Sequence, residues 1–495
     1  MTIGLALQTA LTGLQANQKS TAVLSRNIAN ATTPGYTRKE ATLVSLTVAG
    51  EGRGVAVRDI RRSADLALAR ETRTQASAHA ALTARAELLA TYTQSVGQPE
   101  EQRSLSSAVA GLERSLVALE ELPESPTSQR AVVDAATTLA TRLNGTDKSI
   151  AQIRQQADKD IGAAVDEVNL ALKQLESLNR QVAIRTGSGQ DSSELEDQRD
   201  RLLDQMAERI GIHYFTRDAG ELVVMTSGGV TLLDGRAREL SFSHTAIIGS
   251  GASYPGGLSG ITVEGVDIAP GGGFPNPLKG GKIEGLFAIR DQVMPQFQRQ
   301  ADEVASTLAT MFQQADASIP GTGLNDTGLF TDEGNRHYRT PPFDPASPGP
   351  AGLAGRIRVN DLVRVDAGGD PSRIRTGLHG TAGGNVGDTT QVRAFIDAFR
   401  RQGSFDPAAG LMPNGTLQSF TDAAIGQQHS LRALAETDVK ARSVQLETVR
   451  AAREGKEGVN IDEELQQLMV LERGYAANAQ IMQAAARMLD KLLEI

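Results

Sequence analysis

IDEELQQLMVLERGYAANAQIMQAAARMLDKLLEI, residues 461–495, carries apolar side chains in two rows with heptad spacing. The first row contains Ile461, Leu468, Tyr475, Met482 and Leu489, and the second contains Leu465, Leu471, Ala479, Ala485 and Leu492 or Leu493. Such an a/d-type stripe predicts one long helix with a single apolar face. At about 1.5 Å per residue the helix would be roughly 50 Å long, which is more than a compact domain needs.

The start of this helix is marked by Gly458, which breaks the preceding structure, and by Asn460, which can cap the first turn. Glu463 stands where a capping box has its carboxylate, and Asp462 and Glu464 suit the positive end of the helix dipole. Consecutive helical residues point in different directions. We therefore interpret the three carboxylates as dipole complements and not as a metal cluster.

The N-terminal residues 3–29 repeat the pattern. Apolar or small residues again fall on one stripe, which comprises Leu7, Leu11, Leu14, Thr21, Leu24 and Ile28. Gly4 and Gly13 each cost about 1 kcal/mol relative to alanine, so this helix should be marginal alone. The C-terminal stripe is the expected partner; the alternative is an ordinary two-helix core contact.

Turn-forming residues follow the N-terminal helix. Pro34-Gly35 predicts a turn, and Gly35 is expected to need a positive φ. Beyond it, the segments Glu40–Val48 and Gly54–Ile60 have the composition of two strands and predict a small hairpin.

Motifs at both ends of the chain resemble the bacterial flagellar axial proteins of rod, hook and hook-associated type. The N-terminal signature is carried by Leu11–Gln18, Ser25–Asn30 and Thr33–Arg38, and the C-terminal one by Gly458–Leu465 and Met488–Leu493. They cover about a fifth of the chain. The central residues must therefore decide which member of the family the chain resembles.

The central sequence is helical in pattern from about residue 64 to 210, including a helix of some thirty residues near 150–182. Alternating strand-formers and glycine-rich loops follow from 211 to 281, and helix returns from 283 to 315 with a possible kink at Pro295. A second irregular insertion has its best strand at Arg356–Val365. Helices are again expected at 390–401 and 416–453.

We therefore expect a mainly α fold with β insertions, in which the domains are nested. Residues 1–62 and 459–495 would form a terminal helical domain with a small β-hairpin. Residues 63–210, 282–316 and 386–458 would form a helical bundle, and 211–281 and 317–385 one or two β-rich outer domains. This layout, and the segment Gly280–Asp291, resemble the family of the first hook–filament junction protein, hook-associated protein 1.

Composition and motifs give no support for an enzyme or a cofactor. The formal charge of −9 disfavours nucleic acid as a partner, cysteine is absent, and no apolar run is long enough to span a membrane. The six histidines have no metal-ligand spacing. The glycine-rich segments Gly321–Gly328 and Gly380–Gly387 lack the lysine or glycine spacing of phosphate loops.

The resemblance implies a structural subunit that polymerises at the distal end of the hook to form the hook–filament junction. Its implied partners are itself, the hook protein below, the second junction protein above and a dedicated export chaperone at the C-terminal helix. Export would use the flagellar type III pathway without a cleaved signal peptide, and the subunit would be extracellular. The alternatives are a hook- or rod-type subunit and, from another class, a cytosolic coiled-coil adaptor.

The assembly interface is predicted on the two terminal stripes and the turn between helix and hairpin. Its residues are Leu7, Leu11, Leu14, Asn27, Ile28, Asn30, Pro34, Gly35, Tyr36, Ile461, Leu465, Leu468, Tyr475, Met482, Leu489 and Leu492. Because isolated helices are poorly stable in water, we expect both termini to be largely disordered before assembly and helical after it.

Overall fold

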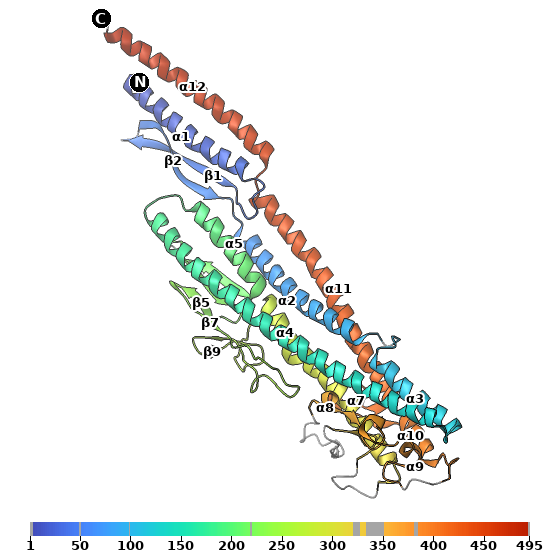
Figure 1. Cartoon of the computed structure of the whole chain (residues 1–495). Helices are drawn as coiled ribbons and strands as arrows, with labels where there is room; N and C mark the ends of the chain where they lie inside the picture. The colour runs from blue at the N-terminus through green and yellow to red at the C-terminus, as the bar shows by residue number, and fades with distance from the viewer. Residues whose placement is uncertain are drawn as a thin grey trace.

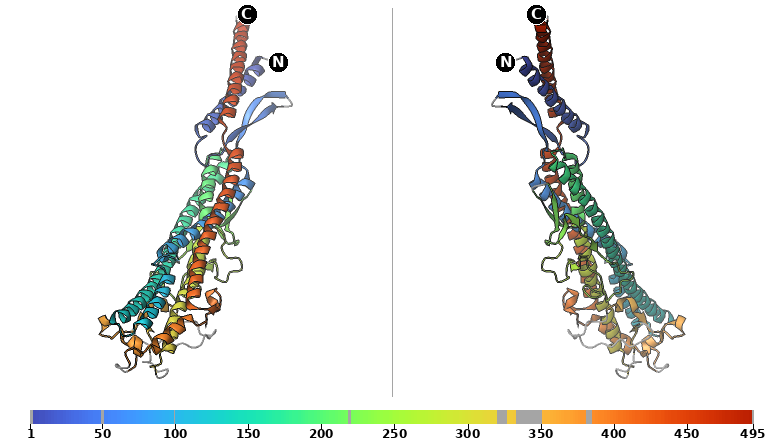
Figure 2. Two further views of the ribbon diagram at one scale, coloured as in Figure 1. Left: turned by 90° about the vertical axis from the view of Figure 1, so that its right-hand side faces the viewer. Right: turned by 90° about the vertical axis from the view of Figure 1, so that its left-hand side faces the viewer.

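The protein is long and slender, with both chain termini at one end (Figure 1). The computed structural model describes residues 3–48, 51–98, 100–217, 220–319, 327–332, 351–380 and 385–493. Two further views show that the helices of the central part run side by side along the molecule (Figure 2). The small strands between residues 212 and 267 lie along the flank of these helices.

Helices dominate the described chain, which confirms the expected mainly α class with β insertions. The α-helices are α1 (Ile3–Ala29), α2 (Leu66–Val96), α3 (Leu105–Glu121), α4 (Pro126–Gly187), α5 (Ser193–Arg209), α6 (Gly281–Ala288), α7 (Met294–Ala315), α8 (Leu353–Arg356), α9 (Arg373–Thr376), α10 (Thr390–Arg400), α11 (Leu417–Glu457) and α12 (Ile461–Leu493). Three short helical segments of other types are η1 (Ile289–Val293), η2 (Val365–Ala367) and η3 (Pro407–Ala409).

Within the described residues, the strands form five small antiparallel sheets. The first sheet is the hairpin of β1 (Lys39–Val48) and β2 (Glu51–Arg62). The second is a meander of β3 (Ile212–Thr216), β4 (Leu222–Thr226), β5 (Thr231–Asp234) and β6 (Arg236–Ala237), and the third contains β7 (Leu240–Ser241), β8 (Thr262–Val263) and β9 (Val266–Asp267). The last two are the pairs β10 (Phe330–Thr331) with β11 (Arg358–Val359) and β12 (Gly403–Ser404) with β13 (Asn414–Gly415). Each sheet is too small to form a core alone, so it packs on helices.

Helix α4 is the spine of the molecule. It begins at Pro126, whose missing N–H and fixed φ suit a first turn, and the Ser125 side chain caps it by accepting from the Ser128 N–H. Its 62 residues extend about 90 Å. The N-terminal part contributes Val132 to Leu143 to one apolar core, and the part from Ile150 onwards contributes to a second. One helix therefore joins two cores.

The passage from α6 to α7 is continuous but locally widened. Residues Ile289–Val293 form a π-helical segment, η1, and α7 begins immediately before Pro295. Proline cannot donate the hydrogen bond expected within an α-helix, and a π segment is a common accommodation of such a defect. This change of helix type lies beside Pro295, where the sequence predicted a possible kink.

Two other expectations differ from the structure. The helix of some thirty residues near 150–182 is twice that length, because no break separates it from Pro126. The strand expected at 356–365 is wrong over most of its length, since strand β11 comprises only Arg358–Val359. It lies between the short helix α8 and the 3₁₀ segment η2.

Of the glycine-rich segments, residues 321–326 and 381–384 lie outside the described residues.

The inserted sheets are joined to the spine by Arg290, a fully buried arginine in η1. Its Nη1 pairs with Asp158 Oδ1 on α4 at 2.5 Å, and its Nη2 donates to the carbonyl oxygen of Ser259 at 2.9 Å. Arg154 on α4 donates to the carbonyl oxygen of Arg290 at 3.0 Å. A buried pair of this kind holds its surroundings in one arrangement because neither charge can be left alone.

Replacing Arg290 by methionine should therefore lower the free energy of unfolding by about 3–5 kcal/mol, since Asp158 would be left buried and unpaired. Urea unfolding of the whole chain measures this loss. Arg236→Met is the matched control, because its pair with Glu264 lies at the surface and should be worth about 1 kcal/mol or less. Equal losses in the two variants would contradict the anchoring role of Arg290.

Candidate assembly interface

Helices α1 and α12 pack against each other in an antiparallel pair (Figure 1). Three contacts fix the register: Asn27 with Glu464, Asn17 with Gly474, and Gly13 with Asn478. A Cβ atom added at Gly13 would lie 2.7 Å from Asn478 Nδ2, and one at Gly474 would lie 3.1 Å from Asn17 Nδ2. Both glycines therefore permit close approach of the helices, whereas their sequence alone indicated only a loss of helix stability.

The buried stripe of α1 is made largely of small and polar residues. It comprises Ala10, Gly13, Ala16, Ser20, Val23, Leu24 and Asn27. The larger residues of the sequence-derived stripe lie beside it: Leu7, Leu14 and Ile28 are half-buried, and Leu11 is 48% exposed. The heptad pattern thus identified the helix, but within the chain the helix buries a neighbouring stripe that shares Leu24 with the predicted one.

Helix α12 turns a minority of its apolar residues towards α1 and leaves most of them exposed. Leu468, Leu471 and Met482 are half-buried and Ala485 is buried. The exposed large apolar residues are Ile461, Leu465, Met469, Val470, Tyr475, Ile481, Met488 and Leu489. The side chain of Leu492 lies outside the described residues. Most of the expected C-terminal interface residues are therefore not covered by the chain itself.

Asn27, near the end of α1, connects three segments of the chain. Its Nδ2 donates to the backbone oxygen of Lys39 at 2.8 Å and to Glu464 Oε2 at 2.9 Å. Its Oδ1 accepts from the backbone N–H of Lys39 at 3.1 Å and from the Tyr36 hydroxyl at 2.9 Å. All four hydrogen-bonding positions of this buried amide are occupied. Asn27 and Tyr36, both predicted from the sequence, are thus brought together.

Glu464 is a member of this cluster that sequence reasoning missed. It is completely buried, and besides Asn27 it pairs with Arg38 Nε at 2.6 Å. The helix dipole alone therefore does not account for this carboxylate. Asp462 is consistent with the expected cap, because its N–H donates to Asn460 Oδ1 at 3.1 Å. The partners of Glu464 are more than four hundred residues away in the chain, so no local pattern could indicate them.

The open end of the hairpin, where β1 begins and β2 ends, is held to α5 by ion pairs. Lys39 Nζ lies 3.2 Å from Asp197 Oδ2, and Arg62 Nε lies 2.8 Å from Asp197 Oδ1. Burial raises the pKa of Asp197 although both cations oppose the shift. Burial also penalises the charge of Asp200, but Arg62 and Arg73 outweigh it and hold the pKa of that carboxyl below its usual value. The hairpin is therefore fixed to the bundle by charges.

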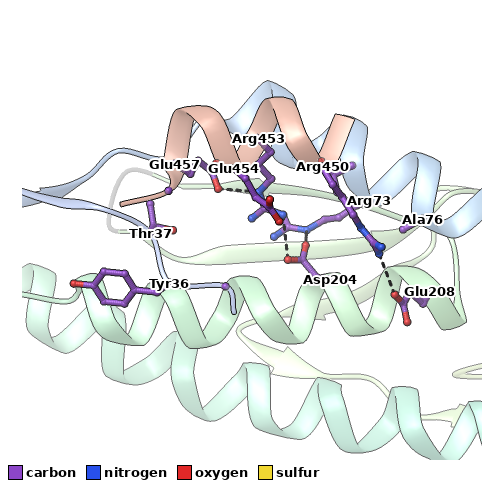
Figure 3. A pocket seen from close by; sticks show the side chains of 13 residues that line it. Tyr36, Thr37, Arg73, Ala76, Asp204, Glu208, Arg450, Arg453, Glu454 and Glu457 are labelled. Carbon is purple, nitrogen blue, oxygen red and sulfur yellow. Dashed lines mark hydrogen bonds and ion pairs between the residues drawn. The ribbon is translucent and has the colours of Figure 1, made fainter. Parts of the chain in front are cut away.

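A second set of contacts joins the end of α11 to the same region. The backbone N–H of Arg38 donates to the carbonyl oxygen of Glu457 at 2.8 Å, and Glu457 Oε2 pairs with Arg453 Nε at 2.8 Å. Arg453 also pairs with Asp204, whose other oxygen lies 2.6 Å from Arg73 Nε. Arg73, Asp204, Arg453 and Glu457 line a cavity of about 260 Å³ in which cations and carboxylates face one another (Figure 3).

The turn between α1 and β1 is exposed. Gly35 has a φ of 73°, which confirms the expected positive value, and a Cβ there would lie 2.7 Å from the Cγ atom of Arg201. Pro34 is exposed, and Asn30 donates from Nδ2 to the backbone oxygen of Arg26 at 2.9 Å. The turn thus contacts α5 while its outer side stays open.

Across the described ranges there is no group of three His, Cys, Asp or Glu side chains arranged to hold a metal ion. In the same ranges, no helix has the length and apolar character needed to cross a membrane.

Asn27→Asp should destabilise the attachment of the terminal helices by about 3 kcal/mol. The change removes the two buried hydrogen bonds that Asn27 Nδ2 donates, and it places a second carboxylate opposite that of Glu464. Hydrogen exchange of the α12 amides measures this attachment. Adding Glu464→Gln should restore part of the loss, since an amide would again face a carboxylate. Asn30→Asp, at the half-exposed end of α1, should cost about 1 kcal/mol or less. Unchanged exchange in Asn27→Asp would contradict the assignment.

The burial of Tyr36 predicts that the free energy of unfolding falls at alkaline pH. Burial, followed by the charge of Asp197, raises the pKa of Tyr36 to about 12. The unfolded chain ionises this group near pH 10, so its contribution to stability is complete below pH 10 and is lost as the pH rises towards 12. Unfolding free energies measured between pH 9 and 12 should fall less steeply for Tyr36→Phe than for the natural chain. Identical slopes would exclude this coupling.

Comparison with known proteins finds three family models that match separate parts of the chain. Residues 90–329 match the helical domain of flagellar hook-associated protein FlgK. Residues 456–495 match the C-terminal domain of flagellar basal body rod FlgEFG proteins, and residues 7–37 match the flagella basal body rod protein family.

Curated relatives agree with these matches. Flagellar hook-associated protein 1 of Salmonella typhimurium is 29% identical over 313 residues, which is 61% of this chain and 55% of the relative. The chain thus spans about half the length of this relative. The Bacillus subtilis protein of the same name is 23% identical over 98% of this chain and 97% of its own length.

The flagellar hook junction protein FlgK of Burkholderia pseudomallei superposes with a TM-score of 0.43 and 22% identity, over 53% of this chain and 46% of that one.

The three matched regions follow the order expected from the sequence motifs, with rod-type domains at the two ends and the FlgK helical domain between them. The chain thus carries the FlgK helical domain between two rod-type ends, and it is similar to proteins named flagellar hook-associated protein 1.

Proposed function

We propose that the chain is a non-enzymatic structural subunit of the bacterial flagellum, which polymerises at the distal end of the hook to form the hook–filament junction. The similarity to these proteins supports this role. The observation that carries it within the structure is the set of exposed apolar residues on α12, a helix that already has α1 as a partner.

These exposed residues lie on both sides of the face that contacts α1. At 100° per residue, Ile461, Leu465 and Met469 fall on one flank of the helix, and Val470, Ile481 and Met488 fall on the other. Contiguous apolar surface on a soluble subunit is typical of an interaction site. A helix with two apolar flanks suits an arrangement in which each subunit contacts a neighbour on either side, as in a ring or helical layer.

The central part of the chain favours a junction subunit over a hook- or rod-type subunit. The alternatives differ in whether residues 64–210 are helical, and helices α2 to α5 occupy most of that segment. The cytosolic adaptor, from another class, predicts no polymer. It also leaves unexplained why the ends of the chain match rod-protein families.

In this proposal residues 1–62 and 459–495 form the inner layer, residues 63–210, 282–316 and 386–458 the bundle, and 211–281 and 317–385 the outer region. The partners are further copies of the chain, the hook protein below, the second junction protein above and an export chaperone at α12. The subunit is exported without a cleaved signal peptide. The motifs at both ends and the exposed face of α12 support these assignments.

Leu465→Asp with Met469→Asp should abolish assembly while leaving the free subunit folded, because both side chains are exposed in it. Motility and electron microscopy of flagella from a strain carrying only this variant measure assembly, and thermal unfolding of the purified chain measures folding. Gln466→Asp with Gln480→Asp adds the same charge on exposed polar positions of α12 and should assemble normally. Normal filaments from the first variant would refute the proposed interface.

A further inference from the structure

A second cavity, of about 400 Å³, lies where α2 faces α11 and the residues that precede α6. One wall is a single stripe of α2, on which Arg73, Ser77, Ala81 and Arg85 follow at four-residue intervals. Arg442 of α11 and the segment from Lys279 to Gly285 line other parts of it. The size is within the usual range of small-molecule pockets.

Hydrogen-bond donors in this cavity lack acceptors. Ser77 is 6% exposed, and its hydroxyl has no hydrogen-bond partner within the described residues. The same is true of Arg85 Nε and of Arg73 Nη1. Gly280 lies against the Ser77 hydroxyl, which a Cβ at that position would approach to 2.5 Å. Buried polar groups without a partner are rare in native proteins and call for an explanation.

The cations of the cavity also lack counter-charges. Among the described residues, no carboxylate forms an ion pair with Arg85, Lys279 or Arg442. Arg442 donates only to neutral amides, those of Gln75 at 2.7 Å and Gln445 at 2.9 Å. Glu284 is the one acidic residue in the described lining, and its Oε2 already accepts from the backbone N–H of Gly280 at 2.6 Å.

The cavity near Glu457 provides an internal comparison (Figure 3). There, each arginine has a carboxylate: Arg73 pairs with Asp204, Arg453 with Glu457, and Arg450 with Glu208 at 3.6 Å. Every arginine of that lining thus has a carboxylate partner without any ligand. The excess of donors and positive charge is therefore specific to the second cavity, in a chain whose formal net charge is −9.

We propose that the second cavity binds an anionic group, a carboxylate or a phosphate. The guanidinium groups of Arg85 and Arg442 and the ammonium of Lys279 would supply charge, and the Ser77 hydroxyl would donate a hydrogen bond. Charge-assisted bonds to such oxyanions are stronger than neutral ones, and arginine matches their planar oxygen pairs. The proposed binding is separate from the proposed assembly, since none of the residues that line the cavity lies on α12.

The test uses the full chain at neutral pH and constant ionic strength, with inorganic phosphate and acetate as probes and chloride as the reference anion. We expect calorimetry to detect binding of at least one probe and the unfolding temperature to rise with it. Arg85→Gln and Arg442→Gln should each weaken this binding by about tenfold or more, because each removes a charged donor. Neither arginine has an ion pair to lose, so both variants should fold.

Arg432→Gln is the matched control on α11, because Arg432 pairs with Glu436 and does not line the cavity. It should bind the probe as the natural chain does. Lys279→Gln, at an exposed position, provides a second variant if an arginine replacement impairs folding. Binding of phosphate alone or of acetate alone identifies which anion the site takes. Absence of binding by both probes, or equal binding by all variants, would overturn the proposal.

Discussion

The buried amide of Asn27 is the constraint on which the arrangement of the terminal helices depends. From its position on α1, this amide forms hydrogen bonds with the first strand of the hairpin and with α12, and all of its own hydrogen-bonding positions are occupied. From Glu464 the contacts continue through Arg38 and Glu457 to Arg453 and Asp204. The end of the molecule is therefore held to the bundle by an uninterrupted series of polar contacts. Their geometry is directional, so they fix orientation as well as proximity.

Polar contacts have this role because the two apolar cores lie elsewhere. Helix α4 carries both cores, and neither includes residues of α1, the hairpin or α12. An apolar core would fill the space between the terminal helices and the bundle, but it would not specify one register of the helices. A buried amide and carboxylate can pair in few ways, so they do specify it. The terminal unit is thus joined firmly to the bundle without using the apolar surface of α12. That surface remains available for contacts with other molecules.

The sequence predicted helices better than it predicted contacts between them. Periodicity located α1 and α12, and the turn chemistry of Pro34-Gly35 predicted both the end of α1 and the positive φ of Gly35, because these features depend on local residues. The functions of Gly13, Gly474 and Glu464 were not predictable in this way. Each depends on a partner at the opposite end of the chain, and heptad spacing carries no information about small residues that bring two helices close.

The distribution of residue sizes between α1 and α12 is the reverse of what a self-sufficient helix pair would have. Large apolar side chains stabilise most when covered, by roughly 1.5–3 kcal/mol each, so an isolated pair gains most by placing them inside. Here α1 buries mainly alanine, glycine, serine and asparagine, while leucine, isoleucine, methionine and tyrosine of α12 remain exposed. Small residues inside bring the two helices close enough to act as one element. The large residues outside would contribute their full burial energy only when another molecule covers them, so this distribution of sizes fits the proposed association of subunits.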